Sequence, residues 1–101
     1  MGKNMILTVD IGNTKILMGL YKNRKLVSHK RISTQKNLTA DDYGLILKKL
    51  FPLEKVEGAV ICSVVTCLKE RFKKLFEKNL KIDSVIVGYE LDLGITLDYE
   101  N

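Results

Sequence analysis

Three polar residues and a glycine near the N-terminus have the types and the spacing of a phosphate-binding turn. Asp10 ends a short apolar stretch, and Gly12, Asn13 and Thr14 follow it. Glycine can adopt a positive φ and lets backbone N–H groups come close to a ligand, while Asn and Thr side chains donate hydrogen bonds to phosphate oxygens. The carboxylate of Asp10 is a hard oxygen ligand suited to Mg²⁺, directly or through water. The segment therefore predicts a turn that holds a metal-bound polyphosphate.

The same residues also have a purely structural interpretation. Asn and Gly are common in hairpin turns, and Asp commonly ends strands. Residue types alone do not decide between the two interpretations, so the position of the motif in the fold matters. A phosphate-binding turn of this kind needs a first hairpin that is followed by further strands and by helices that cover the sheet.

Three strands are expected in the first third of the chain. Residues 5–11 and 16–21 are apolar and rich in β-branched side chains on either side of the Gly-Asn-Thr turn, which indicates a hairpin. A polar turn at residues 22–25 leads to a third strand at 26–32, which is more polar and therefore less covered. The three strands are predicted to be consecutive and antiparallel.

The first helix has clear start and stop signals. Thr39 is the expected N-cap, and Asp41 and Asp42 place negative charge in the first turn, where the helix dipole favours it. Pro52 marks the end of the helix. One apolar stripe runs between these signals at helical spacing, made of Tyr43, Ile46, Leu47 and Leu50.

The residues that follow Pro52 predict a β-α-β unit. The nearly continuous apolar run 58–65 indicates a strand buried on both faces, and residues 84–87 indicate another short buried strand. Between them lies a second amphipathic helix, whose apolar residues are Leu68, Phe72, Leu75, Phe76 and Leu80. The fold class is therefore α/β: a mixed sheet in the order β-β-β-α-β-α-β, with three antiparallel strands first, helices packed on the sheet and right-handed crossovers between the later strands.

Residues 95–99 again have the pattern of a strand, yet the chain stops at Asn101 without a closing element. We therefore expect residues 1–101 to be an N-terminal piece of a longer polypeptide, an incomplete domain that lacks a second domain.

The charge balance raises the question of nucleic acid. The chain of 101 residues has 17 basic and 12 acidic side chains and a formal net charge of +5. Many of the basic residues lie between Lys69 and Lys78, interrupted by Glu70 and Glu77, as on a solvated helix surface. No arginine-rich run or aromatic platform accompanies them. Nucleic acid is therefore not an expected partner.

Neither a membrane span nor a zinc site is expected. The longest nearly apolar run, 59–68, is half of the roughly 20 residues that a membrane helix needs. A zinc site needs four ligands, which Cys62, Cys67 and the single His29 do not supply. Both cysteines are predicted to be buried, reduced thiols, and the expected location is the cytoplasm.

The motifs taken together resemble those of the type III pantothenate kinases. The resemblance is ordered along the chain and so is more specific than any single motif. It rests on Asp10-Ile11-Gly12-Asn13-Thr14, Gly19-Leu20-Tyr21, Arg31-Ile32-Ser33-Thr34, Thr39-Ala40-Asp41-Asp42-Tyr43-Gly44, Ser63-Val64-Val65, Gly94-Ile95 and Asp98-Tyr99-Glu100-Asn101.

The resemblance implies a ribonuclease-H-like domain of the acetate kinase, sugar kinase, Hsp70 and actin superfamily. It implies ATP-dependent phosphorylation of pantothenate, the first step towards coenzyme A. Asp10 would organise Mg²⁺, and Tyr99 would contact pantothenate. The nucleotide phosphate loop would consist of Asp10, Ile11, Gly12, Asn13, Thr14, Lys15, Ile16 and Leu17.

Other parts of the family's machinery would follow Asn101. They are the general-base Asp of a Gly-Ala-Asp-Arg motif, the ligands of a monovalent cation (K⁺ or NH₄⁺), the adenosine contacts and most of a homodimer surface. No catalytic residue is therefore expected within this chain, and residues 1–101 alone are predicted to be inactive.

Two departures from the family pattern affect detail only. Lys15 stands where Asn is common and is expected to point to solvent, and Thr66 replaces a usual proline. Two alternatives stay open: another kinase or ATPase of the same superfamily, and a catalytically inactive kinase-like protein with a regulatory or nucleic-acid-associated role. The ten residues after Asn101 would separate them.

Overall fold

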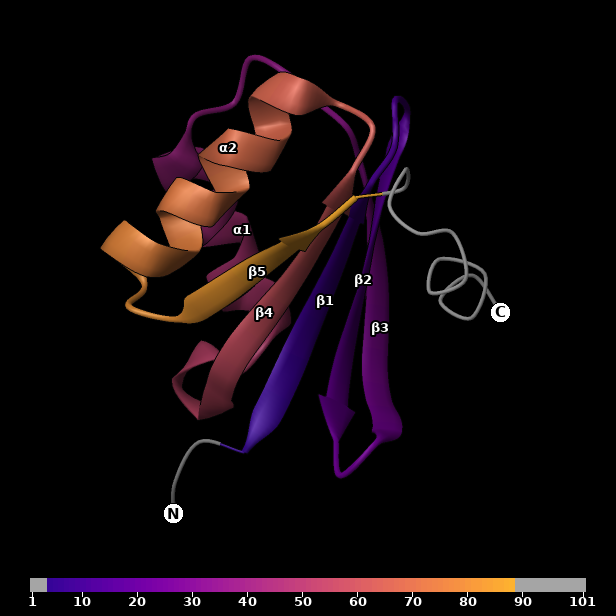
Figure 1. Ribbon diagram of the computed structural model, residues 1–101, viewed down its shortest axis with the longest axis vertical. Coiled ribbons are helices and arrows are strands. Elements are labelled where there is room, and N and C mark those ends of the chain that lie inside the picture. Colours follow the sequence, from indigo (N-terminus) through magenta and orange to yellow (C-terminus); the bar gives the residue numbers. More distant parts are fainter. Residues whose placement is uncertain (1–3, 89–101) are drawn as a thin grey trace.

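Five strands form one mixed sheet in the computed structural model, which describes residues 4–88 (Figure 1). The spatial order of the strands is β3-β2-β1-β4-β5, with β1 antiparallel to β2 and parallel to β4. The predicted α/β class and the mixed sheet are confirmed. The strands are β1 (Met5–Ile11), β2 (Lys15–Lys22), β3 (Lys25–Ser33), β4 (Val56–Ser63) and β5 (Asp83–Val87).

The first three strands are joined by hairpins, as predicted, but their two turns differ. The β2–β3 turn has Asn23 and Arg24 at φ 53° and 70°. Positive φ at both central residues is typical of the type I′ turn, whose twist matches that of the flanking strands. The β1–β2 turn contains no residue with positive φ, so its shape depends on other contacts, which are described with the site below.

Helix α1 (Ala40–Leu50) begins at the predicted N-cap. The Thr39 hydroxyl accepts the Asp42 amide at 3.1 Å, and the Asp42 carboxylate accepts the Thr39 amide at 2.9 Å. This capping box satisfies two amides that the first turn leaves unpaired. The hydrogen bond from the Thr39 amide, followed by the one with its side chain, lowers the pKa of Asp42.

Helix α2 (Thr66–Lys74) is shorter than the predicted second helix, because it widens into a π-helical turn, η2 (Leu75–Asn79). The Leu80 amide closes this turn on the Leu75 carbonyl at 3.0 Å. Both Leu75 and Phe76 are buried there. Apolar spacing cannot distinguish such a turn from a regular helix, because the same residues remain on the core side.

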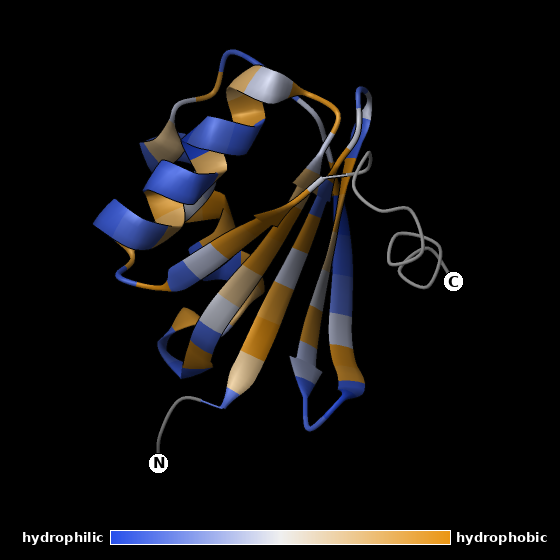
Figure 2. Cartoon of the chain, in the orientation of Figure 1, coloured by the Kyte–Doolittle hydropathy of each residue, from blue (hydrophilic) through white to orange (hydrophobic). Residues whose placement is uncertain are grey.

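Both helices pack on the same face of the sheet. The connections from β3 to β4 and from β4 to β5 run in the same direction across the strand order, so right-handed crossovers put both helices on one side. The buried side chains of β1 and β2 face Tyr43, Phe72 and Phe76 in one core, where the Tyr43 and Phe72 rings are 4.7 Å apart. In Figure 2 the hydrophobic and hydrophilic residues of α2 alternate around its axis, as this packing requires.

The other face of the sheet carries no helix within residues 4–88. Val60 of β4 is half-buried there, and its partner Val85 on β5 is 57% exposed. Cys62, which follows Val60 on the same face of β4, is buried, so the predicted burial of residues 58–65 on both faces is confirmed at the carboxyl end of β4 and is wrong at Val60. The predicted buried strand at 84–87 is wrong on this face, where Val85 is exposed. The physical reason is that both crossovers fall on one side.

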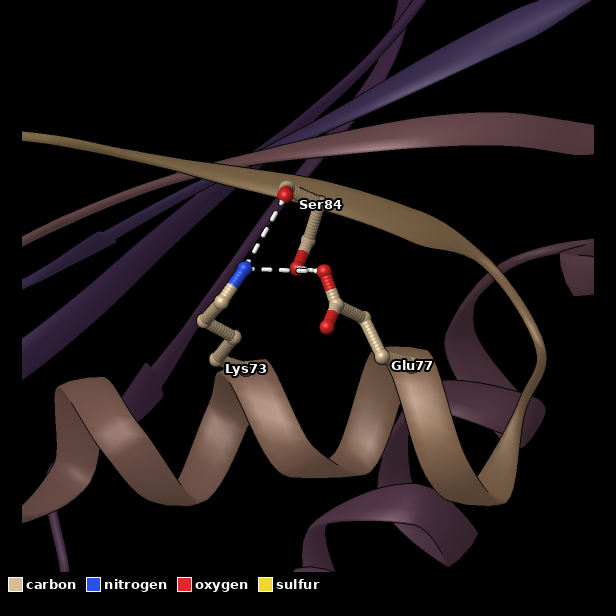
Figure 3. A network of polar contacts seen from close by, with 3 residues as sticks. All are labelled: Lys73, Glu77 and Ser84. Atoms are coloured by element: carbon tan, nitrogen blue, oxygen red, sulfur yellow. Dashed lines mark hydrogen bonds and ion pairs between the residues drawn. The ribbon is translucent and has the colours of Figure 1, made fainter.

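A polar network attaches the edge strand β5 to the helical layer (Figure 3). The Lys73 ammonium donates to the Glu77 carboxylate at 2.8 Å and to the Ser84 carbonyl at 3.2 Å, and the Ser84 hydroxyl donates to the same carboxylate at 3.1 Å. These contacts satisfy the one buried polar side chain among the described residues. The Lys73 hydrogen bond, with a smaller contribution from Ser84, lowers the pKa of Glu77.

Two expectations about α2 need correction. Arg71 is not simply solvated: its guanidinium donates to the carbonyls of Lys36 and Leu38 at 2.6 and 2.8 Å and so fixes the β3–α1 connection. Of the two free cysteines, Cys62 is buried but Cys67 is exposed. Cys67 lies in the first turn of α2, beside the core position Leu68 rather than on the core stripe.

Candidate functional site

The candidate site lies at the carboxyl ends of β1 and β4, two parallel neighbours whose onward connections diverge. From β1 the chain continues to β2 on one side, and from β4 it continues through α2 to β5 on the other. In open α/β sheets, ligands bind at such a topological switch point. The Val64 amide donates to the Ile11 carbonyl at 3.1 Å, which joins the two strand ends. Figure 1 shows the β1–β2 turn and the β4–α2 connection at the same end of the sheet.

The β1–β2 turn is held by hydrogen bonds from two sides. Inside the turn, the Gly12 amide donates to the Lys15 carbonyl at 2.9 Å. From outside, Thr34 donates twice: its hydroxyl to the Gly12 carbonyl at 2.8 Å and its amide to the Thr14 carbonyl at 2.9 Å. The turn therefore has a fixed shape without the positive φ angles of a tight hairpin.

The amides of the turn differ in availability. The Gly12 amide is used within the turn, so it is not free for a ligand as the sequence predicted. The amides of Asn13 and Thr14 donate to no residue in the described part of the chain, and both residues are exposed. Two adjacent exposed amides are the kind of donor that binds phosphate oxygens.

Gly12 suits the turn for a reason other than the one predicted. Its φ is not positive. A Cβ at this position would instead lie 3.2 Å from the Lys15 carbonyl oxygen and would crowd the oxygen that accepts the Gly12 amide. The constraint is therefore close approach of two backbone segments.

Asp10 lies on the face of the sheet that carries no described helix. Side chains alternate along a strand, and Val9 and Ile11 are buried in the helix-covered core, so Asp10 points to the opposite face. It is half-buried there. By register it lies between Leu17 on β2, which is 48% exposed, and Cys62 on β4. Its carboxylate therefore sits at the strand end, two residues before the turn.

The remaining predicted loop residues have different surroundings. Ile11 and Ile16 are fully buried in the core, so only their backbone could face a ligand. Lys15 is exposed. Tyr99, the predicted pantothenate contact, lies outside the described residues.

The role of one residue was missed by sequence reasoning, because Thr34 was named in the Arg31-Ile32-Ser33-Thr34 motif but given no place at the site. Thr34 follows directly after β3 and contacts the turn because β3 pairs with β2 in the register that places Ser33 opposite Lys15. The sequence signal was a hydroxyl residue at a strand end, and only the register links it to the turn.

Asp10 is the carboxylate that β1 places beside the turn. No group of three or more His, Cys, Asp and Glu side chains comes together within residues 4–88. Mg²⁺ commonly keeps several waters and takes one or two carboxylates together with phosphate oxygens. One aspartate beside a phosphate-binding turn fits that donor set, whereas a closed metal cage of protein ligands would not.

Comparison with known proteins decides the family. A family model described as type III pantothenate kinase matches residues 6–101. The chain belongs to the type III pantothenate kinase family. A type III pantothenate kinase of Brevibacillus brevis is 37% identical over 101 residues, and one of an Exiguobacterium species is 35% identical over 102 residues. These matches cover 95% and 96% of this chain but 40% of each relative, so this chain spans about two fifths of their length.

Solved structures agree on the fold of this type III kinase segment. A Bacteroides thetaiotaomicron protein with an actin-like ATPase fold and unknown function superposes with a TM-score of 0.56 at 11% identity, covering 86% of this chain and 34% of its own. RuvC of T. thermophilus, in complex with a Holliday junction substrate, gives a TM-score of 0.54 at 11% identity, covering 84% of this chain and 64% of its own. At such low identity these likenesses concern the fold alone.

No helix among residues 4–88 is long and apolar enough to cross a membrane.

Proposed function

We propose that this chain is the nucleotide-phosphate-binding part of an enzyme that transfers the γ-phosphoryl group of ATP to pantothenate, the first step of coenzyme A biosynthesis. The observation that carries the proposal is the type III pantothenate kinase match over residues 6–101. The placement of Asp10 and the turn at the switch point supports it, because phosphoryl transfer needs a carboxylate for the metal beside donors for the phosphates.

Each residue of the site has a separate role in this proposal. The Asn13 and Thr14 amides, with the side chains of both residues, hold phosphate oxygens at the end of β1. Asp10 holds Mg²⁺, which supplies charge neutralisation when it is bound with the nucleotide. Catalysis of phosphoryl transfer consists mostly of positioning and electrostatic stabilisation. The rigid turn contributes the positioning.

Several parts of the proposal concern groups beyond the described residues. Contact of Tyr99 with pantothenate, a general-base Asp after Asn101, a monovalent cation (K⁺ or NH₄⁺), a homodimer and a cytoplasmic location all stay predictions that the family resemblance implies. So does the description of residues 1–101 as an incomplete ribonuclease-H-like domain.

The binding role can be tested on the chain itself by following backbone amide resonances during a titration with MgATP. We expect the amides of Asn13 and Thr14 to shift most. The Asn23–Arg24 turn at the opposite end of the sheet is an internal control, because it lies between Lys22 and Lys25 and would respond to non-specific attraction of an anion. Equal shifts in both turns would contradict a specific phosphate site.

Asp10→Asn separates metal from phosphate binding. The amide keeps the size of the side chain and removes its charge. We therefore expect Mg²⁺-dependent binding of the nucleotide to fall, while the spectrum of the variant without ligand remains that of a folded chain.

Residues 1–101 alone should form no phosphopantothenate above a blank without protein. In a full-length kinase that carries this segment, Asp10→Ala should reduce kcat with the fold intact, and near-normal turnover would remove Asp10 from the site.

A further inference from the structure

Thr34 makes two hydrogen bonds to the β1–β2 turn, and both go to carbonyl groups. Its hydroxyl reaches the Gly12 carbonyl at 2.8 Å, and its amide reaches the Thr14 carbonyl at 2.9 Å. These are the carbonyls on either side of Asn13. The side-chain bond joins residues that are 22 positions apart in the chain.

The bond to the Gly12 carbonyl fixes the direction of an amide. The carbonyl of Gly12 and the N–H of Asn13 belong to the same peptide plane, and in a trans peptide they point in opposite directions. When the Thr34 hydroxyl holds the carbonyl on its own side, the Asn13 N–H must point away from Thr34. That amide is one of the two that donate to no described residue. Thr34 therefore determines where an open donor of the turn is aimed.

Thr34 is itself held by the core. The next residue, Gln35, bonds through its amide and its carbonyl to the Tyr43 hydroxyl, at 3.1 and 2.7 Å. Tyr43 is fully buried, with its ring against Phe72. Further along, the Arg71 guanidinium holds the carbonyl of Lys36. The hydroxyl of Thr34 thus acts from a fixed position.

We propose that Thr34 is a positioning residue of the phosphate-binding turn: its hydroxyl holds the Gly12 carbonyl so that the Asn13 amide faces the phosphate. The inference rests on the proposed function and adds a residue to it. Thr34 need not touch the ligand. Its effect passes through one peptide plane, so loss of the hydroxyl should weaken phosphate binding more than it changes the fold.

The test compares two variants of the chain in titrations with Mg²⁺ and inorganic triphosphate, followed at the Asn13 amide and by calorimetry. Thr34→Val keeps the shape of the side chain but removes the donor, and Thr34→Ser restores the donor. Loss of one hydrogen bond corresponds to about a five- to tenfold weaker Kd. We expect that loss for Thr34→Val and near-native affinity for Thr34→Ser.

Thr8→Val is the matched control, because the Thr8 hydroxyl also donates to a backbone carbonyl, that of Gly19 at 3.3 Å, but away from the turn. It should leave triphosphate affinity unchanged. If the unmodified chain binds triphosphate and Thr34→Val binds it equally well, the role of Thr34 is refuted and the proposed function stands. If the unmodified chain shows no response at Asn13, the phosphate-binding turn and the role of Thr34 are refuted together.

Discussion

Replacement of Tyr43 by phenylalanine tests how strongly the core holds the connection that leads to the candidate site. The aromatic ring, 4.7 Å from that of Phe72, would remain, while the two hydrogen bonds with Gln35 would be lost. Each bond contributes about 0.5–1.5 kcal/mol net. Because Gln35 is exposed and water can replace part of this, we expect a loss of about 1–2 kcal/mol in the free energy of unfolding.

The loss can be measured by urea and thermal denaturation followed by circular dichroism. In a domain of this size, each 1 kcal/mol lowers Tm by about 4–8 °C. Tyr21→Phe is the matched control, since the Tyr21 hydroxyl bonds to no other residue among those the structure describes. Tyr21→Phe should change the free energy of unfolding by no more than about 0.5 kcal/mol. Equal stability of the two variants would show that the Tyr43 hydroxyl does not anchor Gln35, and the account of how Thr34 is held would then be wrong.

Three further predictions concern the fold and its surface. The lowered pKa of Asp42 means that its capping bond with Thr39 stabilises the fold above the pKa of an unfolded aspartate, and that this contribution is lost as the pH falls through the folded pKa. Urea midpoints measured at decreasing pH should therefore fall less steeply in Asp42→Asn than in the unmodified chain. Equal slopes for the two proteins would contradict this. Phe72→Ala should cost about 3–5 kcal/mol, measured by urea unfolding, because the side chain is fully buried between two aromatic rings. A thiol reagent should modify Cys67 rapidly in the native chain and Cys62 only after unfolding, and mass spectrometry showing equal rates would contradict their different exposure.

Much of the fold could be predicted because local signals and packing agree. The N-cap at Thr39, the stop at Pro52 and the apolar stripe of α1 each depend on residues close together in the chain. Strand β4 was predicted from its apolar run, but which of its faces is buried was not predicted correctly. Burial on the second face depends on which side the crossovers take, and that is a property of the strand order rather than of residues 58–65.

The candidate site was located by sequence but its geometry was not. The position of Asp10 at the end of β1 follows from the strand pattern. The Gly12 amide bonds within the turn to the nearby Lys15 carbonyl, whereas the reach of Thr34 to the Gly12 carbonyl depends on a contact across 22 positions. No local rule contains such a contact, because it arises only once β2 and β3 have paired in register.

Strand β3 forms one edge of the sheet and carries basic but no acidic side chains. Most of its side chains are exposed, and Lys25, Lys30 and Arg31 are among them. Two such edges would repel one another, which opposes edge-to-edge pairing of sheets into fibres. This protection is electrostatic and is screened over about 10 Å at 0.1 M salt. Concentrated stocks of the chain should therefore keep better at low ionic strength than in high-salt buffers.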